Sequence, residues 1–277
     1  MKNMLSRHRK IRLIVQACFA ALSNGYIKGF ARGEIFTGGT KYFCVPGMNC
    51  YSCPGALGAC PIGSLQATLN SREYKISLYV VGLLVIFGTL LGRVVCGFLC
   101  PFGLVQDLLY KIPFVKKIRR LPGEKGLRAL RFVFLGVFVI LLPAFVADFT
   151  GLGEPWFCKW ICPVGTLEGG IPLVLLNSAM RGAAGFIFRW KLAILIVTLL
   201  SSIIIYRPFC RYVCPLGAIY GVFNKISFFR IKIDTDKCTK CGACQKICKL
   251  DIPVYKNPNS VDCIRCGDCK AACPMIY

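Results

Sequence analysis

Histidine and acidic residues are scarce in this sequence. The 277 residues include one histidine, and 12 Asp and Glu stand against 35 Lys and Arg. With His8 alone in a basic segment and no C-x-x-C-H, haem ligation by histidine is excluded. Charged residues make up only 17% of the chain, and the mean hydropathy is +0.60. That composition is too apolar for an ordinary water-soluble domain and favours a membrane protein.

Four apolar stretches have the length of transmembrane helices, about 20 residues each. They are 11–30, 76–92, 129–147 and 190–206. The first is diluted by Asn24 and Lys28, but no cleavage site of small residues follows it. We therefore expect a retained helix rather than a signal peptide. Polar residues interrupt segment 166–188, which we expect to be interfacial or re-entrant, with a fifth span as the alternative.

Basic residues are unevenly distributed along the chain. Basic residues outnumber acidic ones five to none in 1–12, nine to two in 93–131, twelve to five in 207–277 and five to two in 27–75. In 148–189 there are three of each. Lys and Arg collect in cytoplasmic loops. We therefore expect a multi-pass protein of the cell (inner, cytoplasmic) membrane, with both termini cytoplasmic. The net charge of +23 then reflects topology and attraction to membrane lipid, and no nucleic-acid partner is expected.

Cysteine, by contrast, is abundant, with 19 residues. Two tail runs, 238–248 and 263–273, have the spacing C-x2-C-x2-C-x3-C of bacterial ferredoxins, in which the fourth cysteine of each run binds the other cluster. This spacing predicts one [4Fe–4S] cluster on Cys238, Cys241, Cys244 and Cys273 and another on Cys263, Cys266, Cys269 and Cys248. Zinc sites are the alternative, with a less specific match. Lys249 replaces the proline that usually follows the first run, and Gly242 and Gly267 allow close backbone approach.

A second motif, C-x3-C-P-x-G, occurs at 96–103, 158–165 and 210–217, with an altered copy, C-P-I-G, at 60–63. Proline disfavours helix in the preceding residue and favours the first helical turn. Each second cysteine should therefore face a helix N-terminus, which favours an anionic cluster. The copies divide 1–230 into two parallel repeats, about 11–128 and 129–230. Residues 231–277 are the expected ferredoxin-like domain.

Side-by-side packing of the repeats would bring like motifs together into two further sites. The inner site would contain Cys96, Cys100, Cys210 and Cys214, the four thiolates that a [4Fe–4S] cluster requires. The outer site would combine Cys158 and Cys162 with two of Cys44, Cys50, Cys53 and Cys60, and we favour Cys53 and Cys60 because both precede proline. Disulfides remain open only for outward cysteines such as Cys44 and Cys50. Cys18 is expected to be a packing residue.

The predicted fold is thus a membrane α-helical domain of about four transmembrane helices in two pseudo-repeats with re-entrant or interfacial helices. A small α+β ferredoxin domain follows, and the cofactors are four [4Fe–4S] clusters. Residues 94–105 hold no charge, so the membrane clusters should lie at or below the headgroup boundary. If the 17 residues of 76–92 alone separated them, they would be about 25 Å apart. Re-entrant placement, allowed where protein buries the backbone, would shorten this gap.

From residue 11 onward the chain resembles the NapH/NosR-type membrane polyferredoxins. The resemblance is carried by the paired C-x3-C-P motifs, the two-cluster tail and the stretch C-Y-S-C-P-G-A-L-G-A-C-P-I-G-S-L-Q at 50–66. It implies electron transfer between a membrane quinol or cytoplasmic donor and an extracytoplasmic redox partner. The outward copy of the motif at 158–165 departs from the simplest family pattern, because it adds cysteine ligands to those expected at the inner site.

The expected function is transmembrane electron transfer between a cytoplasmic donor such as ferredoxin and an extracytoplasmic or membrane redox partner, such as a flavoprotein or reductase. One alternative is a quinol dehydrogenase subunit with a quinone or flavin at an interface. It would need a protonatable residue at membrane depth, for which Asp107, Glu168 and Lys28 are candidates. The other alternative is a cluster-based copper reductase or assembly factor. No catalytic residue is predicted.

Overall fold

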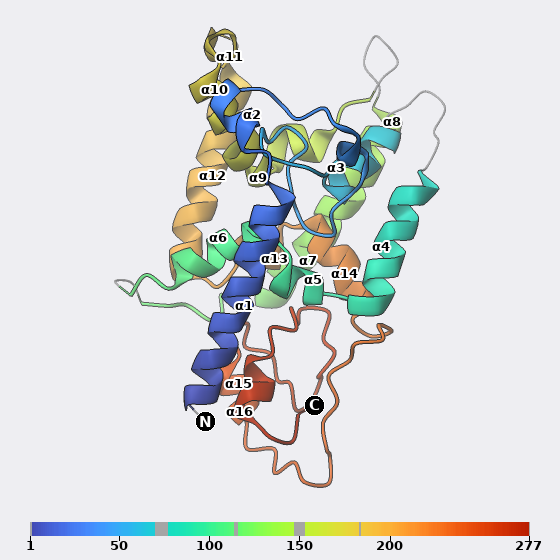
Figure 1. Cartoon of the computed structure of the whole chain (residues 1–277). Coiled ribbons are helices and arrows are strands. Elements are labelled where there is room, and N and C mark those ends of the chain that lie inside the picture. Colours follow the sequence, from blue (N-terminus) through green and yellow to red (C-terminus); the bar gives the residue numbers. More distant parts are fainter. Residues whose placement is uncertain (1, 70–76, 114–115, 147–152, 183, 277) are drawn as a thin grey trace.

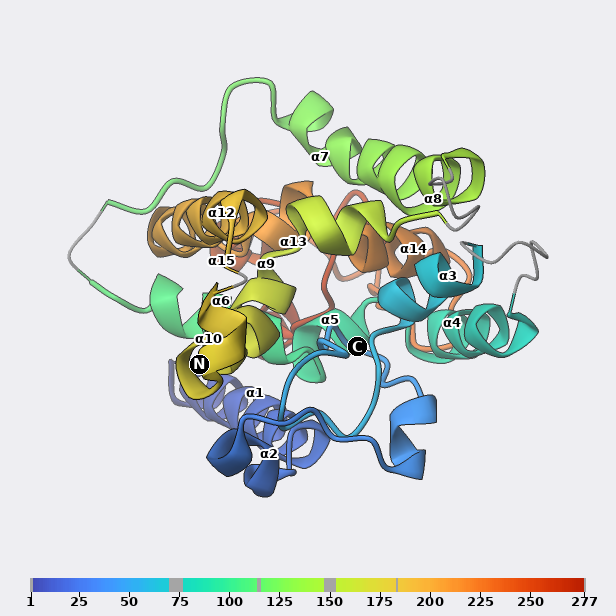
Figure 2. The ribbon, with the colours of Figure 1, turned by 90° about the horizontal axis from the view of Figure 1, so that it is seen from above.

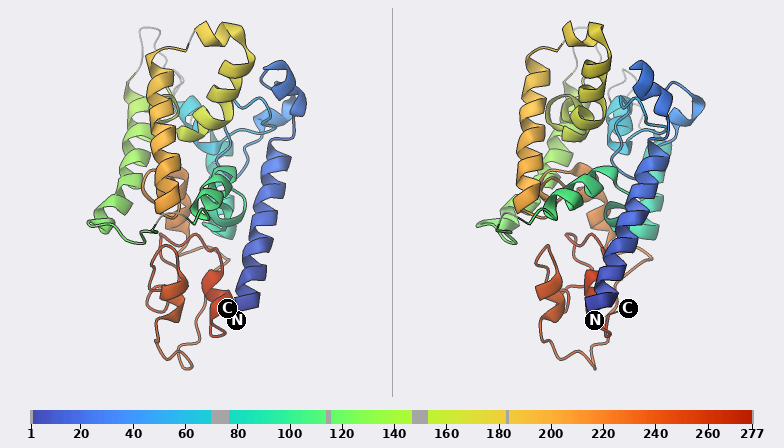
Figure 3. Two further views of the ribbon diagram at one scale, coloured as in Figure 1. Left: turned by 90° about the vertical axis from the view of Figure 1, so that its left-hand side faces the viewer. Right: turned by 60° about the vertical axis from the view of Figure 1, so that its left-hand side comes forward.

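Long helices aligned roughly along one axis build most of the molecule (Figure 1). The computed structural model describes residues 2–69, 77–113, 116–146, 153–182 and 184–276. The tail after residue 230 lies at one end, together with both chain termini (Figure 3). We call this the tail end and the opposite end the far end. Short segments of the membrane part dip toward the middle from both ends (Figure 1).

The first repeat begins with the long helix α1 and ends with a pair of short helices that carry the first full motif. Its elements are α1 (Lys2–Ser23), α2 (Ile27–Arg32), the 3₁₀ turn η1 (Gly39–Tyr42), α3 (Pro61–Leu69), α4 (Leu78–Leu91), α5 (Val94–Phe98) and α6 (Pro101–Tyr110). Both α3 and α6 start at the proline of their motif, because proline fits the first helical turn. Ser77 caps α4 by accepting the Val80 N–H.

The second repeat has the same order of parts. It contains α7 (Glu124–Val133), the π-helical η2 (Phe134–Leu141), α8 (Leu142–Phe145), η3 (Phe157–Ile161), α9 (Pro163–Gly165), η4 (Thr166–Gly170), α10 (Ile171–Leu176), α11 (Ser178–Gly182), α12 (Phe186–Ile204), α13 (Pro208–Tyr212) and α14 (Pro215–Phe223). Segment 157–182 dips inward from the far end and returns there in Figure 1, where α10 and α11 lie. Viewed from above, α1, α4, α7 and α12 are peripheral, with α5 and α13 nearer the centre (Figure 2).

Two helices in the described residues have the length and composition to cross a membrane. They are Glu124–Phe145, with a mean hydropathy of 2.1, and Phe186–Ile204, with 1.9. Leu78–Leu91 and Pro163–Leu176 are apolar but shorter. The predicted spans 129–147 and 190–206 therefore have counterparts, whereas four spanning helices are not confirmed. Residues 76 and 147, at the ends of two predicted spans, lie outside the described residues.

Helix α1 differs from the predicted span 11–30 for an electrostatic reason. It begins at Lys2 and ends at Ser23, so its basic first half reaches the tail. Arg9 forms an ion pair of 3.0 Å with Asp268, and the buried Arg12 forms one of 3.1 Å with Asp107. The helix thus presents polar groups to the rest of the protein where a lone span would be apolar throughout.

The tail contains two short helices, α15 (Ala243–Ile247) and α16 (Asp268–Ala272). Each follows a glycine with left-handed φ, +74° at Gly242 and +79° at Gly267, a conformation that costs other residues more. The described residues 231–276 contain one isolated antiparallel bridge, Ile233–Ile276, and no longer strand. The α+β form of this domain is therefore not confirmed. The tail has its own apolar core, which includes Tyr206 from the membrane part.

Candidate iron–sulfur sites

Four buried cysteines from two different repeats meet near the tail end of the membrane part. Cys96 and Cys210 lie in α5 and α13, and Cys100 and Cys214 immediately precede α6 and α14. The Cys214 thiol interacts electrostatically with those of Cys210, Cys96 and Cys100, and the Gly217 N–H of the following helix donates to Cys214 Sγ at 3.4 Å. The structure thus brings this quartet, the inner site, together at two helix N-termini.

Cationic side chains surround the inner site. Arg207 donates to the Cys96 carbonyl and, through Nε, to Asp107 Oδ1 at 2.8 Å. Arg93 Nη2 donates to the Cys210 carbonyl at 3.1 Å. Burial alone would raise the pKa of Asp107, but the guanidinium groups of Arg207 and Arg12 hold it below its usual range. The site therefore combines four thiols with fixed positive charge, which suits an anionic cluster.

A second quartet, the outer site, surrounds a cavity of about 530 Å³. It consists of Cys50, Cys60, Cys158 and Cys162, all of which line that cavity. The Cys162 thiol interacts electrostatically with the other three. Lys191 Nζ donates to the Cys158 carbonyl at 3.0 Å, and the cavity also reaches Lys41. Like the inner site, this one joins both repeats.

Cys50, rather than Cys53, stands in this outer group. Cys53 Sγ lies 3.5 Å from Asn24 Oδ1 and is absent from the residues that line the cavity. Proline after a cysteine marks a helix start at Pro61, but Pro54 is followed directly by Gly55 and the chain turns there. The argument from a following helix N-terminus therefore does not apply to Cys53. Cys44 is also apart, with its Sγ 3.3 Å from Ser64 Oγ.

All 19 cysteines are free, so no disulfide joins Cys44 and Cys50. In the tail, the Cys269 thiol interacts electrostatically with those of Cys266, Cys263 and Cys248. We call this quartet the proximal tail site. Burial raises the pKa of the Cys263 thiol to about 12, because the cost of ionising an enclosed thiol outweighs the opposing effect of the nearby Arg93 guanidinium.

The remaining predicted ligands, the distal tail site, lie farther from the membrane part. Cys241 is exposed, Cys238 and Cys273 are half-buried, and Cys244 is buried in α15. Cys18 is exposed on α1. Within the part of the chain that the structure describes, no three His, Cys, Asp or Glu side chains converge closely enough to hold a single metal ion. Four thiols around a wider space, as in the outer site, fit the donor set of a [4Fe–4S] cluster.

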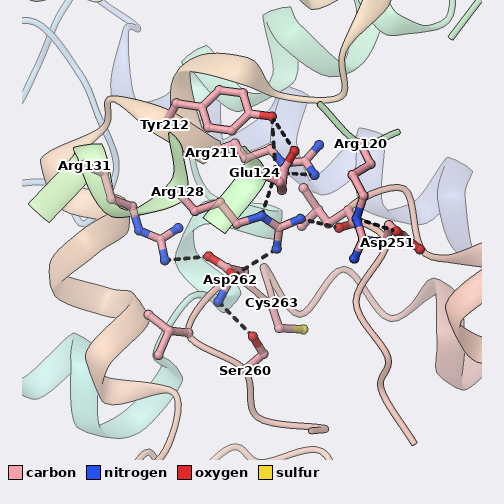
Figure 4. Close-up of polar contacts among 12 residues, drawn as sticks. Arg120, Glu124, Arg128, Arg131, Arg211, Tyr212, Asp251, Ser260, Asp262 and Cys263 are labelled. Carbon is pink, nitrogen blue, oxygen red and sulfur yellow. Dashed lines mark hydrogen bonds and ion pairs between the residues drawn. The ribbon is translucent and has the colours of Figure 1, made fainter. Parts of the chain in front are cut away.

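Salt bridges fasten the tail to α7 (Figure 4). Asp262, next to Cys263, accepts from Arg128 at 2.9 Å and from Arg131 at 2.6 Å. Burial alone would raise the pKa of Asp262, but these guanidinium groups lower it. Arg120 also pairs with Asp251, at 3.5 Å. The proximal tail site therefore lies against the membrane part beside partly buried charge pairs at Asp262, where removal of one partner would leave an uncompensated charge.

The tail backbone touches α5 beside the inner site. A Cβ on Gly97 would lie 2.6 Å from the Ile264 carbonyl oxygen and 3.8 Å from the Cys266 nitrogen. Arg93 Nη1 donates to the Val261 carbonyl at 3.0 Å, while its Nη2 bonds Cys210. Backbone contact and one arginine thus link two cysteines of the inner site to the proximal tail site.

An irregular segment from the far end, residues 46–50, lies between the inner and outer sites. The backbone N–H groups of Met48 and Asn49 hydrogen-bond the thiols of Cys100 and Cys60, respectively. In addition, Met48 Sδ lies 3.5 Å from Cys214 Sγ. Consecutive Cα atoms are about 3.8 Å apart, so neighbouring peptide groups contact one cysteine of each site.

The protonatable residues considered for quinol chemistry have other roles here. Asp107 is paired with Arg12 and Arg207, and Glu168 Oε2 accepts the Cys50 N–H at 2.8 Å. Lys28 is exposed. The functional residues that sequence reasoning missed are Met48, Arg93 and Arg207, together with glutamines discussed below. Only the glutamines had a sequence signal, their fixed distance after C-P-x-G.

This arrangement defines the class: an iron–sulfur protein with a ferredoxin-like tail. Models described as 4Fe-4S binding domains match residues 75–122, 134–171 and 188–235, and residues 231–253. An uncharacterized protein of Methanocaldococcus jannaschii is 31% identical over 193 residues, covering 69% of this chain and 72% of that protein. Ferredoxin-type protein NapH of Haemophilus influenzae is 30% identical over 220 residues, covering 74% and 69%. No solved structure matches.

Methylamine utilization ferredoxin-type protein MauN of Methylorubrum extorquens is 30% identical over 191 residues, covering 68% of this chain and 59% of MauN. The chain belongs to the NapH family of ferredoxin-type membrane proteins, which confirms the resemblance seen in the sequence. It is accordingly an iron–sulfur electron-transport protein.

Proposed function

We propose that the protein conducts electrons across the cell membrane through four [4Fe–4S] clusters. They are held, in order, by the distal tail, proximal tail, inner and outer sites. The tail end faces the cytoplasm and the far end faces outward, as the excess of basic residues in 1–12, 93–131 and 207–277 indicates. When bound, the clusters supply one-electron redox chemistry. The protein's own residues hold, space and enclose them.

The observation that carries this proposal is the position of residues 46–50 between the inner and outer sites. Because Met48 and Asn49 contact Cys100 and Cys60 through adjacent peptide N–H groups, an electron would cross a short path of bonded atoms. Electron transfer across a gap of about 25 Å, the length of a 17-residue helix, would be far slower. Residues 46–50 contact the start of α6, where a Cβ on Gly47 would lie 3.4 Å from Pro101 Cδ, and α14, where the Tyr220 hydroxyl donates to the Pro46 carbonyl. These contacts supply the protein cover that non-helical backbone at membrane depth requires.

The contact between tail and α5 supports the preceding step in the same way. Gly97 lies against the backbone of Ile264–Cys266, and Arg93 bonds both Val261 and Cys210. The inner site is closed to solvent on this side. Electrons would therefore exchange with the proximal tail site through packed protein rather than through water.

The two ends of the chain of sites are suited to different partners. The distal tail site is exposed at Cys241, beside the exposed Lys237 and Lys240, which favours a donor with an acidic face, such as a ferredoxin. The outer cavity reaches the exposed Tyr42 and Tyr51, where an extracytoplasmic flavoprotein or reductase would accept electrons. Quinol oxidation is less well supported, because Asp107 and Glu168 are engaged in structural contacts.

Electron transfer into sealed vesicles tests this function. The full-length holoprotein would be reconstituted with its tail outward, with ferricyanide trapped inside and reduced ferredoxin added outside. We expect about sixteen irons per chain, since each cluster contains four, and reduction of the trapped ferricyanide. A Cys162→Ala variant that keeps the tail clusters is the matched control and should not reduce it. An iron content of roughly eight per chain with no inner or outer spectroscopic signal would overturn the proposal.

A further inference from the structure

Each of the four C-P-x-G motifs has a hydrogen-bonding residue six positions after its cysteine. These residues are Gln66, Gln106, Glu168 and Tyr220. In a helix that starts at the proline, this position lies one and a half turns into the helix. All four side chains form a hydrogen bond at or between the inner and outer sites, so the repeat extends beyond the cysteines.

The two first-repeat residues both donate to a cysteine of the second repeat. Gln106 Nε2 lies 3.2 Å from Cys210 Sγ, and Gln66 Nε2 lies 3.2 Å from Cys158 Sγ. Both glutamines are fully buried. The acceptor is the first cysteine of C-x3-C-P in each case. Two sites of one protein thus carry the same amide-to-sulfur contact in equivalent positions.

Neighbouring groups fix the orientation of the Gln66 amide. The Phe157 N–H donates to Gln66 Oε1 at 3.0 Å, which leaves Nε2 as the group that faces Cys158. Nε2 also donates to the Ile62 carbonyl at 3.2 Å. For Gln106, Nε2 lies 3.4 Å from the Phe102 carbonyl, which cannot donate and so favours the same orientation. The sulfur contacts are therefore N–H···S hydrogen bonds.

The second-repeat residues at this position act on the segment between the sites. Glu168 accepts the Cys50 N–H at 2.8 Å, and the Tyr220 hydroxyl donates to the Pro46 carbonyl at 3.0 Å. The equivalent positions thus have two different roles. In the second repeat they hydrogen-bond the backbone of residues 46–50, and in the first repeat they hydrogen-bond cysteine sulfurs.

We propose that Gln66 and Gln106 are positioning residues that raise the reduction potentials of the outer and inner clusters, respectively. The proposal rests on the proposed function, because it takes Cys158 and Cys210 as cluster ligands. Reduction adds one electron and increases the negative charge on the ligand sulfurs, without bond formation or proton transfer. An N–H donor stabilises that charge more in the reduced state than in the oxidised state. Burial of both glutamines strengthens the effect, because water does not compete for their amide donors.

Redox titration followed by electron paramagnetic resonance tests the proposal on the full-length holoprotein. Gln106→Leu should lower the midpoint potential of the inner signal alone, and Gln66→Leu that of the outer signal alone. The signals are assigned beforehand with Cys100→Ala and Cys162→Ala. Gln16→Leu is the matched control, since the Gln16 amide is also fully buried and has no hydrogen-bond partner among the described residues. It should shift neither signal, and all three variants should retain the wild-type iron content.

A second pair of variants keeps the proposal testable if substitution by leucine causes loss of a cluster. Gln106→Met and Gln66→Met keep the side-chain length but have no N–H donor, so each should again lower one midpoint potential. An unchanged midpoint in an iron-replete Gln66 or Gln106 variant would overturn the proposal. So would cluster loss in both the Leu and Met variants, which would indicate a purely structural role. Wild-type protein without inner and outer signals would instead refute the proposed function itself.

Discussion

The inner and outer sites share a ligand pattern but differ in their surroundings. Around the inner site, the buried Arg93 and Arg207 donate to the carbonyls of ligand cysteines, and the tail covers α5. The outer site borders a cavity of about 530 Å³ that reaches exposed tyrosines. An enclosed site can exchange electrons only with its neighbours in the protein. A site beside an open cavity is accessible to a separate redox partner.

The cationic side chains at the two sites also differ between the enclosed inner site and the accessible outer site. A guanidinium presents several donors in a rigid plane, whereas a lysine is a single charge on a flexible stem. The inner site uses arginines that also bond Asp107 and the tail, so its charge is fixed by the fold. The outer site has Lys41 and Lys191 on its cavity. This difference fits the proposed roles of the inner site as a relay and of the outer site as the point of exchange with a partner.

The largest expected effect is loss of the relay. Cys214→Ala should remove about a quarter of the iron and abolish electron transfer to the far end, because Cys214 interacts with all three other inner thiols. Tail spectra should be unchanged. Iron analysis, paramagnetic resonance and the vesicle assay measure these effects, with Cys18→Ala on the exposed face of α1 as the control. If the inner signal survived in Cys214→Ala, the pairing of the two repeats around one site would be wrong.

The identity of the outer ligands is the next comparison. Cys50→Ser should eliminate the outer signal and transfer to the far end, whereas Cys53→Ser, three residues away, should retain both. The reason is that Cys50 borders the cavity and Cys53 faces Asn24 instead. The same spectra and iron content distinguish the two variants. The opposite result would restore the assignment that the sequence alone favours.

A third prediction concerns the charge network beneath the inner site. Asp107→Asn should lower the free energy of unfolding by about 3–5 kcal/mol, because it leaves Arg12 and Arg207 buried without their carboxylate. Thermal unfolding in detergent measures this loss. Asp236→Asn at an exposed position is the control and should change stability little.

Asp107 should also make the stability of the protein sensitive to acid. The folded protein lowers the pKa of Asp107, so its stabilisation is present above the ordinary aspartate value of about 3.9. It is lost as the pH falls through the lower folded value. Asp107→Asn should therefore remove part of the pH dependence of stability in this acidic range. Parallel unfolding curves of wild type and variant across that range would contradict the assignment.

The sequence predicted those features that depend on local chemistry. Prolines after Cys60, Cys100 and Cys214 start helices because proline fits the first turn, and the apolar runs 129–147 and 190–206 lie in long helices. Family membership followed from the same motifs. The number of clusters and their ligands remain predictions that iron analysis and the cysteine variants test.

The features that the sequence did not predict depend on contacts between distant segments. No local pattern distinguishes Cys50 from Cys53, because the position of Cys50 at the outer cavity involves a bond from its N–H to Glu168, 118 positions away. Likewise, the sequence predicts a span at 11–30, whereas α1 begins at Lys2, and its Arg9 and Arg12 bind acidic groups of the tail and α6. Long-range ion pairs leave no periodic pattern in a single sequence.

The smallest expected effect concerns the joint between relay and tail. Gly97→Ala places a Cβ 2.6 Å from the Ile264 carbonyl oxygen, closer than side chains tolerate. The tail must therefore shift, at a cost of about 1–3 kcal/mol typical of overpacking. Because the shift widens the gap between the proximal tail and inner sites, electron transfer between them should slow while iron content stays constant.

Flash reduction of the tail followed by the rise of the inner signal measures this rate. Gly82→Ala, where an added Cβ meets nothing within 4 Å, should leave the rate unchanged. An unaltered rate in Gly97→Ala would mean that the α5 contact is not the route between tail and membrane part.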